Sequence, residues 1–155
     1  MSDVLSSHVK LAISDAALSL IRREVQMAHD GRETGGILLG EIDPLRVTVA
    51  GAPGPGAVRT KNFFLRDLQF SQGLAAREAA DSGAIWVGEW HTHPVGPAHP
   101  SMTDLKTYQR LQDVPGGVLA RGVLSLIVAP SAVGWSLTAW MCTDGRGTQL
   151  MMEER

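Results

Sequence analysis

The sequence predicts an α+β (mixed α/β) protein whose central sheet is mixed, largely antiparallel and flanked by helices. The first observation is the order of elements: strand-length apolar runs and helical patterns follow one another without a regular βαβ repeat. The second is the uncharged segment 122–143, which Pro130, Ser131 and Gly134 divide into two strand-length halves. Both halves are rich in β-branched or aromatic residues, so a buried hairpin is favoured over the alternative of a membrane span.

The first half of the chain contains one expected helix between strands. This helix is expected from residue 15 to about residue 28, because Ser14 can cap it and apolar residues recur at helical spacing. Strands are expected at residues 9–13, 36–42 and 46–50, and Pro44 makes the turn between the last two. Residues 51–56 form a loop by their glycine and proline content.

The second half contains two further expected helices. Asp67 is expected to cap a helix through residue 81, which Gly83 ends. Another helix is expected at residues 102–112, followed by a loop at residues 115–117. Strands are expected at residues 63–65, 84–93, 123–129 and 135–141. The last two strands form the hairpin that is expected to complete the core.

Length and composition indicate an ordinary globular protein. The 155 residues suit one domain, residues 1–155, with a core that needs no disulfide. The net charge of −2 gives no reason to expect nucleic acid or an anionic membrane as a partner. Cys142 is the only cysteine, so no intramolecular disulfide can form, and residues 1–7 lack the pattern of a secretory signal. We therefore expect a cytoplasmic protein without a membrane segment.

A candidate metal site follows the apolar run at residues 84–93. His91 and His93 are two residues apart in an expected strand, so both imidazoles lie on the same face. Asp104 follows near the start of the next helix, after a loop that three prolines stiffen. Two histidines, one carboxylate and a water form a recurrent ligand set for catalytic zinc. The alternative for Ser101 and Asp104 is a structural capping box, and a His-x-His pair alone is a weak signal.

A hydrolytic zinc site also needs a general base and a donor to the developing oxyanion. The candidates for the base are carboxylates that do not bind the metal: Glu24, Glu33, Glu41, Glu78 and Glu89. Glu33 is favoured, because it precedes Gly35 and Gly36 at the mouth of an apolar strand, where glycines allow close approach of a substrate. The alternative for Glu33 is an ordinary turn residue.

Three segments together resemble the signature of the JAMM (MPN+) zinc metalloproteases: Glu33-Thr34-Gly35-Gly36, His91-Thr92-His93-Pro94 and Ser101-Met102-Thr103-Asp104. The loop at residues 53–56, followed by the segment 63–67, resembles the compact prokaryotic JAB branch in particular. The resemblance implies a cytidine-deaminase-like JAB/MPN fold and one Zn²⁺ per chain. By the same resemblance His91, His93 and Asp104 bind zinc, Glu33 is the general base and Ser101 stabilises the oxyanion.

The resemblance also implies a substrate class. Members cleave amide or isopeptide bonds after the C-terminal Gly-Gly of ubiquitin-like proteins, whose extended tail lies beside a strand. Bacterial relatives accompany E1-like and E2-like proteins, including in anti-phage operons, or sulfur-carrier proteins. The alternatives are processing of a sulfur-carrier protein, hydrolysis of another amide, and a non-catalytic scaffold, which the intact motif disfavours.

Residues outside the motif carry weaker expectations. His99, inside the proline loop, is expected to be an exposed loop residue, with a role in the substrate channel as the alternative. Trp90 alternates with the two histidines, so it is expected on the opposite, buried face. Trp86, Trp135 and Trp140 are expected in the core rather than at the ligand site.

Overall fold

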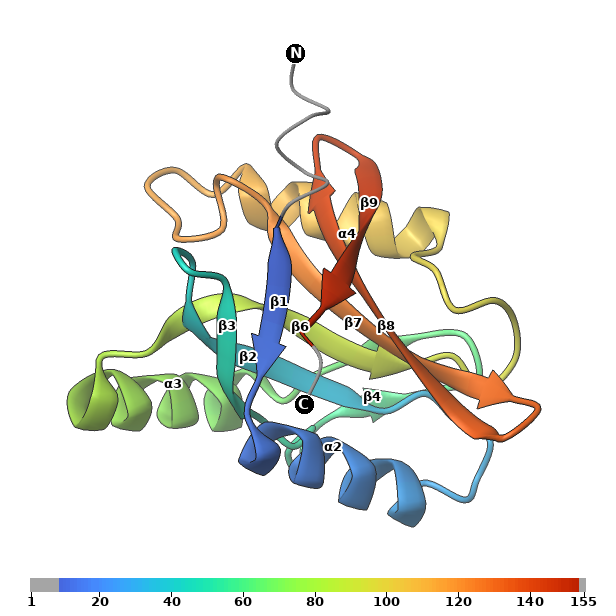
Figure 1. Cartoon of the computed structure of the whole chain (residues 1–155). Coiled ribbons are helices and arrows are strands. Elements are labelled where there is room, and N and C mark those ends of the chain that lie inside the picture. Colours follow the sequence, from blue (N-terminus) through green and yellow to red (C-terminus); the bar gives the residue numbers. More distant parts are fainter. Residues whose placement is uncertain (1–8, 154–155) are drawn as a thin grey trace.

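The computed structural model describes residues 9–153 (Figure 1). Its helices are α2 (Asp15–Met27), α3 (Leu68–Ser82) and α4 (Met102–Gln112). Its strands are β1 (Lys10–Ile13), β2 (Gly35–Glu41), β3 (Arg46–Ala50), β4 (Val58–Arg59), β5 (Phe64–Leu65), β6 (Ile85–Thr92), β7 (Val123–Ser131), β8 (Gly134–Thr143) and β9 (Arg146–Met152). None of the helices described is long and apolar enough to span a membrane.

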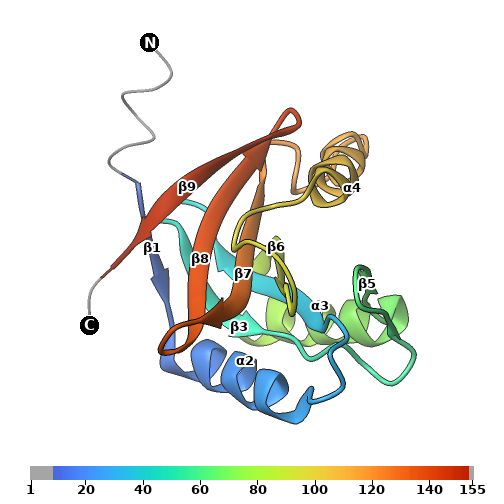
Figure 2. The same cartoon turned by 90° about the vertical axis from the view of Figure 1, so that its right-hand side faces the viewer.

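Seven strands form a closed barrel in the order β1-β3-β2-β6-β7-β8-β9. β1 is parallel to both β3 and β9, and β6 is parallel to β7, whereas the remaining neighbours are antiparallel. The α+β class with a mixed sheet is therefore confirmed. The expected flanked sheet is replaced by a barrel with α2, α3 and α4 on its outside (Figure 1, Figure 2). The pairing of β1 with β9 makes the difference, because it joins the two sheet edges.

The prediction that the β7–β8 hairpin completes the core is wrong, because β9 follows it and closes the barrel. β9 buries only Leu150 among its seven residues and starts with a polar run, so it lacks the apolar pattern of a core strand. The turn that precedes β9 contains a sequence signal from which this strand could have been predicted. Asp144 and Gly145 both have positive φ, as a tight two-residue hairpin turn requires. The short strand β4 was also missed.

The three predicted helices are confirmed, with bounds that agree to within one or two residues. The Ser14 hydroxyl accepts a hydrogen bond from the N–H of Ala17 at the start of α2, and the Asp67 carboxylate accepts one from the N–H of Phe70 in α3. Gly83 ends α3 with a φ of 75°, a left-handed conformation that glycine adopts without steric cost. The helix starts were therefore predictable because caps are local interactions.

The main core lies inside the barrel and beneath α2, and it contains apolar residues from most strands. Trp90 is fully buried there, as expected, and its indole N–H donates to the carbonyl of Gly51 at 2.8 Å. Trp86 and Trp140 are partly buried against smaller apolar clusters. The expectation of a core position for Trp135 is wrong. Its side chain is 51% exposed, because it lies beside the tip of the β7–β8 hairpin rather than under a covering element.

Candidate metal centre

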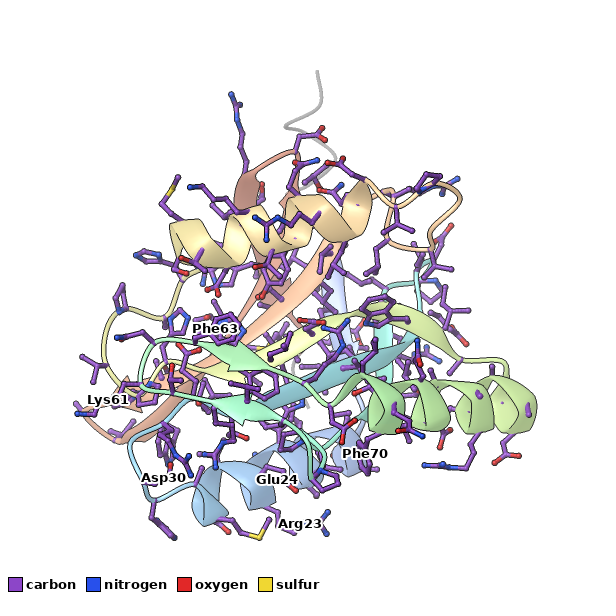
Figure 3. The ribbon with its side chains drawn as sticks, turned by 180° about the vertical axis from the view of Figure 1, so that it is seen from behind. Arg23, Glu24, Asp30, Lys61, Phe63 and Phe70 are labelled. Atoms are coloured by element: carbon purple, nitrogen blue, oxygen red, sulfur yellow. The ribbon has the colours of Figure 1, made fainter. Side chains whose placement is uncertain are left out.

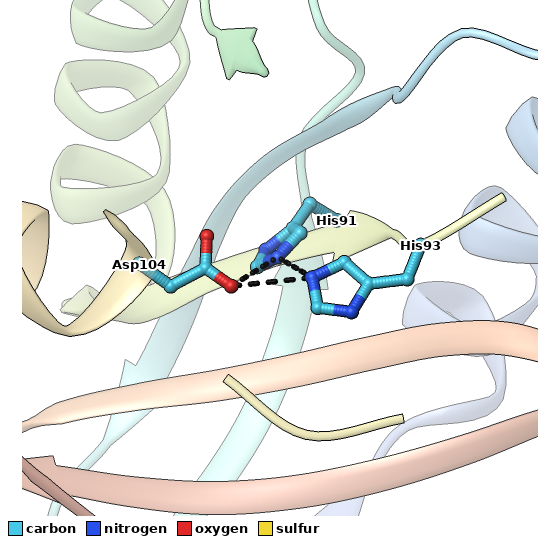
Figure 4. Close-up of side chains that lie close together, drawn as sticks. All are labelled: His91, His93 and Asp104. Carbon is cyan, nitrogen blue, oxygen red and sulfur yellow. Dashed lines mark hydrogen bonds and ion pairs between the residues drawn. The ribbon is translucent and has the colours of Figure 1, made fainter. Parts of the chain in front are cut away.

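Three predicted ligand side chains converge at the carboxyl end of β6 (Figure 4). The Nε2 atoms of His91 and His93 are 2.9 Å apart, and Oδ2 of Asp104 is 3.2 Å from each of them. Both histidines are buried, with 5% and 6% exposure. The chain keeps its strand course as far as His93 because the His93 N–H donates to the carbonyl of Val128. The strand period of two therefore directs both rings to one point.

Asp104 reaches the histidines from the first turn of α4. Its N–H donates to the hydroxyl of Ser101, and its Oδ2 accepts the N–H of Ser101, so the expected capping box is present. The same carboxylate thus caps the helix and faces both imidazoles. Burial disfavours its charged form, but the hydrogen bonds with His91 and His93 outweigh burial and hold the pKa of Asp104 well below its usual range. The carboxylate is therefore ionised and available as a ligand.

The donor set and its geometry fit a zinc ion. Four ligand atoms at zinc bond lengths of about 2.0–2.1 Å lie about 3.3 Å from one another in a tetrahedron. The three separations here, 2.9, 3.2 and 3.2 Å, are close to that value. His93 Nδ1 is 2.8 Å from the carbonyl of Pro97, to which it can only donate, so the lone pair of Nε2 is directed to the site. Three protein donors leave a fourth position for a water molecule.

Strand pairing brings Glu33 to the same site. In the antiparallel ladder of β2 and β6, Gly35 lies opposite His91, and the ladder continues through the Thr92 N–H, which donates to the carbonyl of Thr34. Continuing this register by two residues places Glu33 opposite His93, on the same face as the histidine side chains. A Cβ at Gly35 would lie 2.9 Å from both His91 Cβ and a ring carbon of Phe64. Glycine is therefore required where β2 passes the site.

Glu33 is 8% exposed and lines two hollows beside the ligands. The smaller, of about 40 Å³, also contacts His91 and Asp104, and the larger, of about 280 Å³, also contacts His93 and Ser101. Burial raises the pKa of Glu33, although the two histidines partly oppose the shift. A carboxylate with a raised pKa is a better proton acceptor than an ordinary one, as general-base chemistry needs.

A short ribbon, β4 and β5 with their connecting turn, lies beside the site and holds the backbone of Glu33. The Glu33 N–H donates to the carbonyl of Thr60 at 2.7 Å, and Nε of Arg59 donates to the carbonyl of Glu33 at 2.9 Å. The Arg59 guanidinium also forms an ion pair with Asp30. In Figure 3, Asp30 and Phe63 lie on opposite sides of the ribbon. Both polar groups of the Glu33 backbone are therefore fixed by the ribbon.

Glu89, another candidate for the base, has a different environment. Its carboxylate pairs with the Arg66 guanidinium, which also lies 5.1 Å from the centre of the Trp86 ring. Burial raises the pKa of Glu89, and Arg66 opposes that shift. Glu89 borders only the smaller hollow, whereas Glu33 borders both. The geometry therefore favours Glu33 as the residue that meets a substrate.

The other expected residues also lie at this cleft. Ser101 is exposed and lines the larger hollow, and His99 is exposed there as expected, with its ring 6.4 Å from that of Trp140. Sequence reasoning missed Arg59, Arg66 and Tyr108. For Tyr108 a signal was present, since it follows Asp104 by one helical turn and so shares its face. For Arg59 and Arg66 no local sequence pattern predicts their partners, which lie far away in the sequence.

The barrel with three outer helices and a convergent His–His–Asp group defines a JAB-like protein. A family model described as prokaryotic homologs of the JAB domain matches residues 14–143. The chain belongs to this family and is a compact prokaryotic JAB/MPN protein. The resemblance drawn from the motif residues is thereby confirmed.

Similar proteins include three named CD-NTase/cGAS isopeptidase. Those of Pseudomonas aeruginosa, Escherichia coli and Vibrio cholerae are 34%, 33% and 32% identical over 65%, 66% and 55% of this chain. The matches span 66%, 65% and 57% of the lengths of these relatives. A solution structure of a Desulfitobacterium hafniense protein has a TM-score of 0.69 at 16% identity and covers 94% of both chains, which shows that the fold is shared.

Proposed function

We propose that this protein is a zinc-dependent isopeptidase or peptidase that cleaves the amide bond after the C-terminal Gly-Gly of a ubiquitin-like protein. The observation that carries the proposal is the position of Glu33, a buried carboxylate beside the three candidate ligands but not one of them. A structural capping box would need Ser101 and Asp104 alone. It would not need two buried histidines and a second buried carboxylate at the same place.

The residues divide the proposed reaction among them. His91, His93 and Asp104 would hold a zinc ion, which as a Lewis acid would polarise the scissile carbonyl and lower the pKa of water. Glu33 accepts a proton from the attacking water as its oxygen bonds to the carbonyl carbon. The C–N bond then breaks, and Glu33 delivers that proton to the leaving amine. Ser101 Oγ accepts the N–H of Asp104, so its own hydrogen can be donated to the oxyanion.

The ribbon supports an extended substrate tail. Within the described residues β5 has one strand partner, β4, so its other edge can accept an added strand. Figure 3 shows Phe63 on the side of the ribbon that faces α4. The smaller hollow beside Glu33, at about 40 Å³, has room for only a few water molecules. We propose that glycines suit this site because a side chain at the same position would have no room.

Cleavage of a defined fusion tests the proposal. The probes are bacterial ubiquitin-like and sulfur-carrier proteins that end in Gly-Gly and continue into a short peptide. The zinc-loaded protein is expected to cut one of them after Gly-Gly, and at least about tenfold more slowly after Ala-Ala, because one missing or added methyl changes the fit by about 1–3 kcal/mol. Mass spectrometry of the products locates the bond. Equal cleavage of the Gly-Gly and Ala-Ala fusions, or cleavage of none, would contradict the proposal.

The names of the relatives suggest a setting for this activity. We propose that the chain removes a ubiquitin-like protein from a CD-NTase-type enzyme in anti-phage signalling, with E1-like and E2-like proteins as further partners. The second candidate is processing of a sulfur-carrier precursor, which uses the same chemistry on a peptide bond instead of an isopeptide bond. Fusions with a lysine-linked and a main-chain-linked leaving group separate the two. A third, broader candidate is hydrolysis of another amide.

Thiol chemistry offers a second test, because a cysteine thiolate is an alternative nucleophile for cleaving an amide bond. Cys142 is buried, and burial raises the pKa of its thiol to about 12, so almost no thiolate is present at pH 8. We expect iodoacetamide to leave both Cys142 and the activity unchanged in the folded protein and to alkylate Cys142 in denaturant. Mass spectrometry and the cleavage assay measure these results. Rapid alkylation of the folded protein with parallel loss of activity would contradict a metal-dependent mechanism.

A further inference from the structure

Tyr108 places a buried hydroxyl behind the first candidate ligand. Its Oη lies 3.5 Å from Nδ1 of His91 and 2.8 Å from Oγ of Ser125. Tyr108 is 3% exposed and Ser125 is fully buried. Both side chains are almost wholly excluded from solvent, so each hydroxyl needs a hydrogen-bond partner to avoid the cost of an unpaired polar group. The two hydroxyls and the imidazole nitrogen are thus the partners available to one another.

The three groups come from three different elements. His91 belongs to β6, Ser125 to the neighbouring parallel strand β7, and Tyr108 to α4, which packs across β7 and β8. Asp104 and Tyr108 are four residues apart on α4 and so lie on one helical face. One helix face therefore presents a candidate ligand and a hydroxyl that touches another candidate ligand. Asp104 approaches His91 at Nε2, and Tyr108 approaches the same ring at Nδ1.

The direction of these hydrogen bonds decides which nitrogen can bind a metal. If Tyr108 donates to Ser125, its oxygen is left to accept the Nδ1–H of His91, and Nε2 then carries a lone pair. If Tyr108 instead donates to Nδ1, the ring proton sits on Nε2 and blocks coordination. The fully buried Ser125 hydroxyl is the closer of the two partners, and its oxygen can accept the phenolic hydrogen. The 2.8 Å separation suits donation by either hydroxyl, and donation by Tyr108 to Ser125 is the direction that leaves Nε2 free for a metal.

We propose that Tyr108, backed by Ser125, is a positioning residue that fixes the tautomer and orientation of His91 and so strengthens zinc binding. This inference rests on the proposed function only in taking zinc as the metal. Tyr108 borders the smaller hollow beside Glu33, and its hydroxyl acts through His91 rather than on the metal itself. His93 has its own equivalent partner, the carbonyl of Pro97, so the two imidazoles are oriented independently.

Zinc affinity measures the role without any substrate. Tyr108→Phe removes the hydroxyl and keeps the ring, and we expect it to weaken zinc binding by about 10- to 100-fold in competition with a chelator. Ser125→Ala, which leaves the Tyr108 hydroxyl free to turn, is expected to weaken it by a smaller factor. Gln112→Met is the matched control. Gln112 is a buried polar residue of the same helix, and its amide pairs with Ala120 and Asp144, away from the ligands. Its replacement should lower thermal stability and leave zinc affinity within about twofold.

The ring protons of the histidines report the orientation directly. In zinc-loaded protein with ¹⁵N-labelled histidine, we expect slowly exchanging Nδ1–H signals from His91 and His93. Tyr108→Phe should lose the protection of the His91 proton and keep that of His93, which donates to Pro97. The His93 signal is therefore an internal control against a general structural change.

The outcomes separate this inference from the proposed function. If wild-type protein binds no zinc, the proposed function fails. If wild-type protein binds zinc and Tyr108→Phe binds it within about twofold, or keeps the protected His91 proton, the inference alone is overturned. Equal weakening by Gln112→Met also overturns it, since the effect would then be structural. Should Tyr108→Phe fail to fold, unchanged zinc affinity and His91 protection in Ser125→Ala would overturn it.

Discussion

Replacing Glu33 by glutamine is expected to reduce the turnover of a Gly-Gly fusion by about 10²- to 10⁴-fold, the usual contribution of a general base. Glutamine has the same shape but cannot accept a proton from the attacking water. Zinc should remain bound, because Glu33 is not one of the three converging ligands. The backbone of residue 33 should also keep its hydrogen bonds with Thr60 and Arg59, so the fold around the site is preserved.

Glu41→Gln is the matched control for this prediction. Glu41 is the last residue of the same strand, β2, and its side chain is exposed. Initial rates and zinc content are measured for the wild-type protein and both variants. Glu41→Gln should retain both the rate and the metal. A Glu33→Gln variant that keeps more than about a third of the wild-type rate would remove Glu33 as the base, and a variant that loses zinc would make Glu33 a ligand.

The elements that the sequence predicted well are those that local interactions define. The caps at Ser14, Asp67 and Ser101 act within one helical turn, so each helix start could be read from a few residues. The histidine pair was equally local, because a strand period of two is enough to place both rings on one face. The candidate metal ligands are therefore predictable from local sequence alone.

Long-range pairings explain what could not be predicted. The barrel closes through β1 and β9, and β9 has one buried residue, so no apolar pattern marks it. Glu33 meets His93 because β2 pairs with β6, and no local feature specifies that register. The resemblance to the JAMM signature links Glu33 to the two histidines, but it does not say how these side chains are arranged in space. The anchors of the ribbon, Arg59 and Arg66, depend on partners distant in sequence and emerged only from the structure.

We propose that His91, His93 and Asp104 bind one catalytic zinc ion. A site with three protein ligands keeps only two protein donors when one ligand is removed. The two that remain are too few to hold the zinc ion. We therefore expect His91→Ala to abolish stoichiometric zinc binding at neutral pH. Zinc should also raise the melting temperature of the wild-type protein and not that of the variant, because a ligand that binds only the folded state stabilises it.

His99→Ala is the control, since His99 is an exposed histidine at the same cleft that does not join the three ligands. The most direct measurement is the zinc content of the three purified proteins after equilibration with zinc and removal of the excess. We expect about one zinc per chain in the wild-type protein and in His99→Ala, and almost none in His91→Ala. Wild-type protein without zinc at neutral pH, or His91→Ala with as much zinc as the wild type, would contradict this proposal.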